Sequence, residues 1–109
     1  MNVVMVYMTA GSMEQARIIA RELITRRLAA CVNVLEGMTA MYWWEGRMEQ
    51  AQEVVVLAKT REDLLSALVE QVRLVHEYDC PCIVSWPLTG GYPPFLDWIG
   101  RETGEKMIS

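Results

Sequence analysis

Few side chains in this 109-residue sequence have the chemistry to bind a metal ion or to act as a nucleophile. His76 is the only histidine, and the cysteines are Cys31, Cys80 and Cys82. His76 lies close in sequence to acidic and phenolic residues, so a borderline ion such as Cu(II) could meet one imidazole nitrogen and carboxylate oxygens there. Because one nitrogen makes a weak site, we expect Cu(II) to bind at His76 with modest affinity. Cys31 would contribute only if the fold brings it alongside.

The segment Cys80-Pro81-Cys82 is a second arrangement with metal-binding chemistry. In an extended chain two thiols at this spacing lie about 6.5 Å apart, which is too far for one soft ion unless the backbone bends. The simpler interpretation is that both cysteines are small, partly buried apolar groups. His76 also has a simpler interpretation, in which its side chain lies near the C-terminus of a helix and interacts with the negative end of the helix dipole.

Motifs of known catalytic machinery are missing from the sequence. It contains no Gly-rich phosphate loop, no nucleophile elbow and no metalloprotease helix motif. A catalytic Cys–His pair would need a cysteine and an orienting carboxylate close to His76, and the sequence alone does not place them together. We therefore expect a protein that is not an enzyme.

Charge and composition limit which partners and which cellular compartment we expect for this protein. The formal net charge is -4, without a cluster of Lys or Arg to match a phosphate backbone, so nucleic acid is not an expected partner. The N-terminal apolar run is too short for a signal sequence or a membrane span, which favours a cytoplasmic protein with no membrane partner. An odd number of cysteines in such a chain predicts reduced thiols rather than disulfides.

Hydrophobic patterning predicts the order strand, helix, strand, strand, helix, strand in a single domain over residues 1–109. Strands are expected at 3–8, 31–44, 48–60 and 83–86, and two long helices have apolar positions over 16–28 and 64–75. Ser12 and Gln15 form a capping box before the first helix, Gly100 is the expected C-cap of a short last helix at 95–99, and 101–109 is a loose tail. The order predicts an α+β, ferredoxin-like β-α-β-β-α-β sandwich with both long helices on one face of an antiparallel four-stranded sheet.

The two central strands are expected to form an extended hairpin. A bulge at Glu36-Gly37 bends its first arm, and Glu45-Gly46 supplies the turn. Both arms exceed ordinary strand length, so the hairpin should project beyond the rest of a small domain.

Three aromatic residues near the tip of this hairpin, Tyr42, Trp43 and Trp44, need to be covered. Strand alternation points Trp43 and Trp44 to opposite faces, and a projecting arm has no core of its own on either face. One alternative is a local minicore under the C-terminal helix with Phe95 and Trp98. We favour the other, a partner subunit, because exposed aromatic patches on small domains usually mark interfaces.

Several segments together resemble the CutA divalent-cation-tolerance family over nearly the whole chain. They are residues 28–33 (Leu-Ala-Ala-Cys-Val-Asn), 42–46 (Tyr-Trp-Trp-Glu-Gly), 59–60 (Lys-Thr) and 76–81 (His-Glu-Tyr-Asp-Cys-Pro), with Tyr92, Leu96 and Trp98. The resemblance implies a ferredoxin-like fold, a tight homotrimer built from long hairpin strands, a cytoplasmic location and a link to copper and other divalent cations. It also implies Cys31 and His76 as the copper ligands.

We therefore expect a non-enzymatic homotrimer of the divalent metal ion response, with weak binding of copper or another divalent cation and no other cofactor. Tyr42, Trp43 and Trp44 are its expected interface residues. The alternative is a trimeric signalling scaffold that resembles the PII proteins. Such a scaffold would bind a small effector in intersubunit clefts lined by Glu45, Lys59 and Tyr78.

Overall fold

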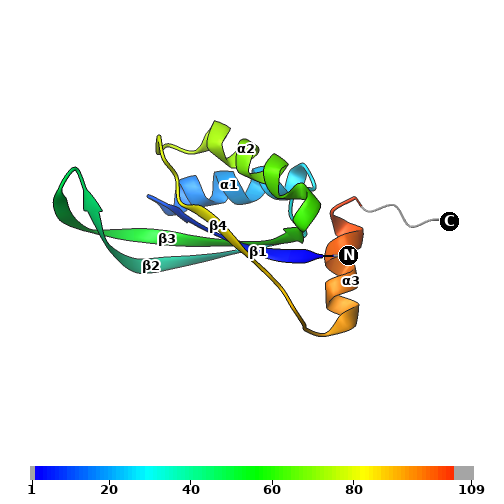
Figure 1. Cartoon of the computed structure of the whole chain (residues 1–109). Coiled ribbons are helices and arrows are strands. Elements are labelled where there is room, and N and C mark those ends of the chain that lie inside the picture. The colour runs from blue at the N-terminus through cyan, green and yellow to red at the C-terminus, as the bar shows by residue number, and fades with distance from the viewer. Residues whose placement is uncertain (1, 105–109) are drawn as a thin grey trace.

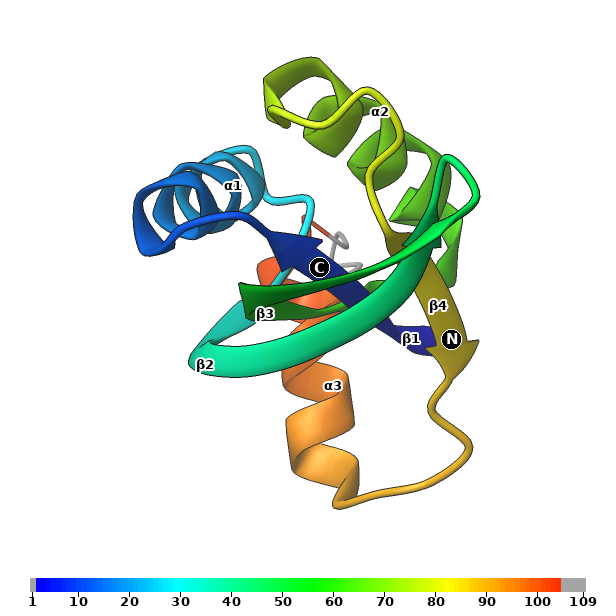
Figure 2. The same ribbon diagram turned by 90° about the vertical axis from the view of Figure 1, so that its left-hand side faces the viewer.

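The computed structural model describes residues 2–104 of the chain. Within this range the strands are β1 (Val3–Ala10), β2 (Cys31–Trp44), β3 (Arg47–Arg61) and β4 (Ile83–Pro87), and the helices are α1 (Met13–Thr25), α2 (Leu65–Val75) and α3 (Pro93–Glu102), with a 3-10 turn at Glu62–Leu64 before α2. The strands form one antiparallel sheet in the order β2-β3-β1-β4. Helices α1 and α2 lie together on one face, and α3 lies on the other side near the start of β1 (Figures 1 and 2). The predicted α+β, ferredoxin-like fold is confirmed.

The core lies between the sheet and the two long helices. Alternate residues of the central strands point to this face, because successive side chains of a strand point to opposite faces. The fully buried members include Val6 and Met8 of β1, Val56 and Ala58 of β3, Ile19 and Leu23 of α1, and Leu68 and Val72 of α2. Each large apolar side chain buried here contributes about 1.5–3 kcal/mol relative to its exposed state.

Helix α1 begins where the sequence predicts and ends earlier. The Ser12 side chain accepts a hydrogen bond from the Gln15 amide at 3.1 Å, as an N-cap does. The helix ends at Thr25 rather than at residue 28, because Arg27 takes a left-handed φ of 58°. The amide of Leu28 then turns back to the Leu23 carbonyl at 2.9 Å, so Leu28 packs beside the core from outside the helix.

The central hairpin projects beyond the other strands (Figure 1). β1 pairs with residues 54–61 of β3, so residues 47–53 of the described β3 pair with β2 alone. Seven strand residues extend over roughly 23 Å, and the described chain as a whole measures 55 × 26 × 21 Å. The predicted bulge is present: the ladder shifts register between Leu35 and Met38, and Gly37 has a φ of 86°, which favours glycine.

The apolar side chains of the projecting arm are exposed in the single chain. Trp43 is 76% and Trp44 57% accessible, and Met41 and Met48 are comparably open. The minicore interpretation is wrong, because α3, where Phe95 stacks on Trp98, lies at the opposite end of the molecule from the hairpin tip (Figure 1).

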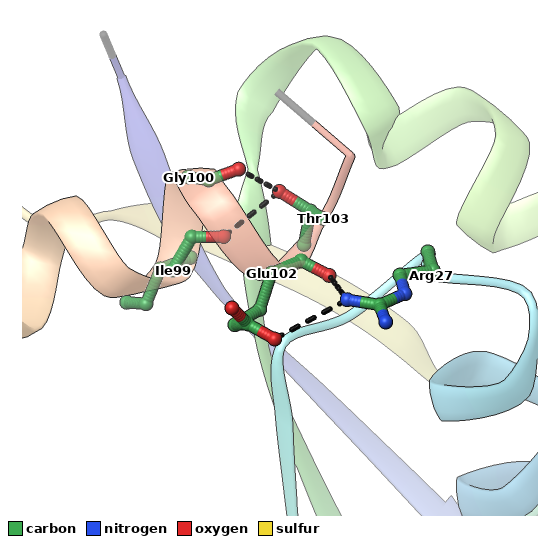
Figure 3. Close-up of polar contacts among 5 residues, drawn as sticks. All are labelled: Arg27, Ile99, Gly100, Glu102 and Thr103. Atoms are coloured by element: carbon green, nitrogen blue, oxygen red, sulfur yellow. Dashed lines mark hydrogen bonds and ion pairs between the residues drawn. The ribbon is translucent and has the colours of Figure 1, made fainter. Parts of the chain in front are cut away.

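Helix α3 continues past the predicted cap at Gly100 and ends at Glu102. The Thr103 hydroxyl hydrogen-bonds the carbonyls of Ile99 at 2.8 Å and Gly100 at 3.0 Å (Figure 3). The Arg27 guanidinium donates to the Glu102 carbonyl at 3.1 Å and to its carboxylate at 3.2 Å (Figure 3). These contacts satisfy carbonyls of the last turn and join the helix to the loop after α1.

The remainder of the predicted tail, from residue 105 onward, lies outside the described residues. Among the helices between residues 2 and 104, none is long and apolar enough to span a membrane.

Candidate functional site

A groove of about 420 Å³ lies between the projecting hairpin and the loop that follows α2. Three strands and the loop that follows α2 contribute to it. Its lining comprises Thr9 of β1, Tyr42 and Trp44 of β2, Glu53 of β3, and Tyr78, Asp79, Cys80 and Cys82 of the loop. The groove therefore combines aromatic, acidic and thiol side chains.

The ring of His76 fixes the start of this loop. Its Nδ1 accepts a hydrogen bond from the Tyr78 amide at 3.0 Å, and its Nε2 lies 2.8 Å from the Thr9 carbonyl. An acceptor at Nδ1 places the proton on Nε2, which then donates to that carbonyl. The ring is buried, with 9% of the residue accessible. Both nitrogens are thus occupied by backbone groups of the same chain.

Gln15 braces the same loop from the first turn of α1. Its side-chain amide donates to the Val75 carbonyl at 3.3 Å, and its side-chain oxygen accepts from the Glu77 amide at 2.8 Å. Gln15 is 3% accessible. In a capping box this side chain would turn back to Ser12, so the second half of that prediction is wrong. Its partners are 60 and 62 residues away in sequence, so no local sequence pattern predicts these hydrogen bonds.

Tyr78 and Glu53 form the polar centre of the groove. The Tyr78 hydroxyl donates to a Glu53 carboxylate oxygen at 2.8 Å. Burial, followed by this hydrogen bond, raises the pKa of Tyr78 to about 12. Burial and the Glu53 charge also raise the pKa of the Cys82 thiol. A Cβ on Gly11 would lie 3.0 Å from the Tyr78 hydroxyl, so glycine suits that position.

The structure does not bring Cys31 and His76 together. Cys31 lies opposite Lys59 on β3, and Lys59 in turn lies opposite Met5 on β1. The His76 ring contacts Thr9, four residues or about 13 Å further along β1. Within residues 2–104 no three His, Cys, Asp or Glu side chains are grouped as a metal site would need. The condition for Cys31 to join a His76 site is therefore not met.

The other predicted site residues are dispersed in the single chain. Lys59 Nζ contacts the Asn33 side-chain oxygen and lies 3.9 Å from Cys31 Sγ. Glu45 is at the turn of the hairpin, with a φ of 50°. Of the three predicted cleft residues only Tyr78 lines the groove. A cleft between subunits stays a prediction, because it would combine residues of different chains.

Replacement of His76 tests whether its ring holds the loop. His76→Ala removes two hydrogen bonds and a buried ring, so we expect a loss of about 2 kcal/mol or more in the free energy of unfolding. The neighbouring exposed Glu77 donates to Gln15 through its backbone, so the control Glu77→Ala should stay within about 0.5 kcal/mol of the wild type. Denaturant unfolding measures both variants. Equal stability of the two would remove His76 from this structural role.

Tyr78 predicts a dependence of stability on alkaline pH. A tyrosine in an unfolded chain has a pKa of about 10, whereas that of Tyr78 is raised to about 12. Between these values the folded chain keeps a proton that the unfolded chain loses. The corresponding stability is complete below about pH 10 and is lost as the pH rises through about 12. Thermal melts of metal-free protein across this range should show a smaller fall in Tm for Tyr78→Phe than for wild type.

The exposed residue Tyr92, which is 74% accessible, supplies the control for that measurement. Tyr92→Phe should keep the wild-type fall in Tm. If Tyr78→Phe also keeps it, the Tyr78 hydroxyl makes no contribution of its own.

Comparison with known proteins gives consistent matches. The family described as CutA1 divalent ion tolerance protein matches residues 4–102. The chain is 40% identical over 103 residues to "Protein CutA 1, chloroplastic" of Oryza sativa subsp. japonica, covering 94% of this chain and 58% of that protein. It is 41% identical over 99 residues to "Divalent-cation tolerance protein CutA" of Thermus thermophilus, covering 91% of this chain and 96% of that protein.

Solved structures agree with the fold. The crystal structure of CutA1 from Oryza sativa has a TM-score of 0.92 at 39% identity and covers 96% of each chain. The Cut A1 protein from Thermus thermophilus has a TM-score of 0.91 at 40% identity and covers 94% of this chain and 99% of that one.

Length and compartment differ among the relatives. The chain spans 58% of the rice protein and 62% of a CutA homolog from Xenopus laevis. The rice protein is called chloroplastic and the Archaeoglobus fulgidus structure periplasmic, so the cytoplasmic location stays a prediction for this chain. The family match spans most of the sequence, and the chain belongs to the CutA1 divalent ion tolerance protein family.

Proposed function

We propose that the protein acts in divalent cation tolerance as a non-enzymatic homotrimer whose hairpin aromatic residues form the contacts between subunits. One observation carries this proposal: the apolar side chains of the projecting hairpin are open to solvent in the single chain. A soluble domain rarely leaves so large an apolar surface uncovered. A second copy of the same chain is the occupant that the family resemblance favours.

The edges of the sheet support assembly. β2 and β4 are the two outer strands, and each has a row of backbone groups without a neighbouring strand in the described chain. Exposed edges of this kind readily pair with another chain. Val84 and Trp86 of β4 are also 54% and 45% accessible, so apolar side chains accompany both edges. Two different surfaces that meet head to tail produce a closed ring when the rotation closes.

Weak copper binding at His76 is the finer part of the proposal, and Cys31 of the same chain is left out because it lies opposite Lys59, away from the His76 ring. To offer Nδ1 to a metal ion, the His76 ring would have to release the Tyr78 amide, and to offer Nε2 it would have to release the Thr9 carbonyl. Either exchange opposes the loop contacts, which is consistent with the modest affinity expected for one imidazole.

Replacement of Trp44 tests the assembly. Truncation of a buried interface tryptophan typically costs about 2 kcal/mol or more, equivalent to roughly 30-fold in a dissociation constant. Multi-angle light scattering at micromolar concentration should give a trimer for wild type and a reduced trimer fraction for Trp44→Ala. Because assembly stabilises the fold by mass action, Tm should fall as well.

A matched control is Leu74 on the outer side of α2, which is 65% accessible. Leu74→Ala should keep the trimer mass. A monomer mass for wild-type protein would refute the proposal, and a fall in Tm without a change in mass would assign Trp44 to packing within one chain.

A further inference from the structure

A second cavity, the α3 cavity, has a volume of about 750 Å³ and lies between α3, the start of β1 and the loop that joins β4 to α3. Helix α3 is at the opposite end of the molecule from the hairpin tip (Figure 1). The described lining includes none of the hairpin aromatic residues, and of the edge strand β4 it includes only the last residue, Pro87. The α3 cavity is therefore separate from the hairpin surface proposed for the subunit contact.

Backbone hydrogen bonds hold the sides of the α3 cavity in place. The amide of Leu88 donates to the Val3 carbonyl at 3.0 Å, and the amide of Glu62 donates to the Asn2 carbonyl at 2.9 Å. Helix α3 is anchored by Ile99, which is fully buried. Sites for small molecules are usually preformed and measure about 300–1,000 Å³, so the α3 cavity has the size and the fixed frame of such a site.

Three charged side chains line the α3 cavity: Glu62, Asp97 and Arg101. All three are exposed, so a ligand can reach them from solvent. Asp97 and Arg101 are four residues apart on α3, a spacing at which acidic and basic side chains often pair. Within residues 2–104, however, none of the three forms an ion pair. One guanidinium and two carboxylates are thus available to a ligand.

We propose that the α3 cavity binds a small zwitterion, a free amino acid or a dipeptide that carries an apolar side chain. The guanidinium of Arg101 suits a carboxylate, to which it can donate two parallel hydrogen bonds. The carboxylates of Glu62 and Asp97 suit an ammonium group. Leu88 and Leu96 also line the cavity and offer apolar surface to the side chain of the ligand.

The mixture of charges argues against two other classes of ligand. A nucleotide or another polyanion would place its phosphates beside the carboxylates of Glu62 and Asp97, and like charges in such contact are costly. A simple cation would lie beside the guanidinium of Arg101, with the same cost. A molecule that carries both charges avoids both penalties.

Isothermal titration calorimetry on the full chain tests the proposal with two probes, L-leucine and the dipeptide Leu-Leu. At least one of them should bind with one molecule per chain, and the one that binds more tightly identifies the source of the zwitterion. Its C-terminal amide and its N-acetyl derivative each lack one charge. Each derivative should bind roughly 10-fold or more weakly, because a hydrogen-bonded charge pair is lost.

Replacement of Arg101 assigns the carboxylate contact. Arg101→Gln should weaken binding of the zwitterion by a similar factor and should remove the preference for the free acid over its amide. The matched control is Arg17→Gln, which removes an exposed arginine of α1 and should bind like wild type. Circular dichroism checks that both variants are folded.

Three results would overturn the proposal: binding of neither probe to wild-type protein, unchanged binding and acid preference in Arg101→Gln, or an equal loss in Arg17→Gln. Light scattering on the same samples separates this inference from the proposed function. A monomer that binds the zwitterion would refute the trimer alone, whereas a trimer that binds neither probe would refute the zwitterion site alone.

Discussion

The difference in length between neighbouring strands is the constraint on which the other features depend. β3 has 15 residues and β1 has 8, so almost half of β3 continues beyond the sheet with β2 as its only neighbour in the described chain. A two-stranded ribbon alone is at best marginally stable in water. The ribbon is therefore the part of the sheet with the least support from its own domain, and its residues Tyr42, Trp44 and Glu53 form one wall of the groove.

The other wall of the groove depends on the burial of one histidine. A lone histidine near acidic residues suggests a ligand when only the sequence is considered. In the folded chain its ring instead joins the end of β1 to the loop after α2. Together with Gln15, which holds the same loop from α1, the His76 ring sets the position from which Tyr78 reaches Glu53 and the two cysteines reach the groove.

Local patterns predicted the elements of the fold, and contacts distant in sequence decided the site. The order of strands and helices follows from hydrophobic periodicity, and the bulge follows from Gly37, whose φ of 86° suits glycine. The end of α3 was misjudged because glycine is a common cap, whereas Thr103 satisfies the last carbonyls here. The pairing of Glu53 with Tyr78 joins residues 25 apart, and only the tertiary packing creates it.

Amide hydrogen exchange along the hairpin tests the central claim most directly. If neighbouring subunits cover the projecting arm, amides of residues 38–52 that pair within the hairpin should exchange as slowly as those of β1, because opening them requires loss of the assembly. Protection confined to residues 54–61 of β3, with rapid exchange throughout the projecting arm, would contradict the account.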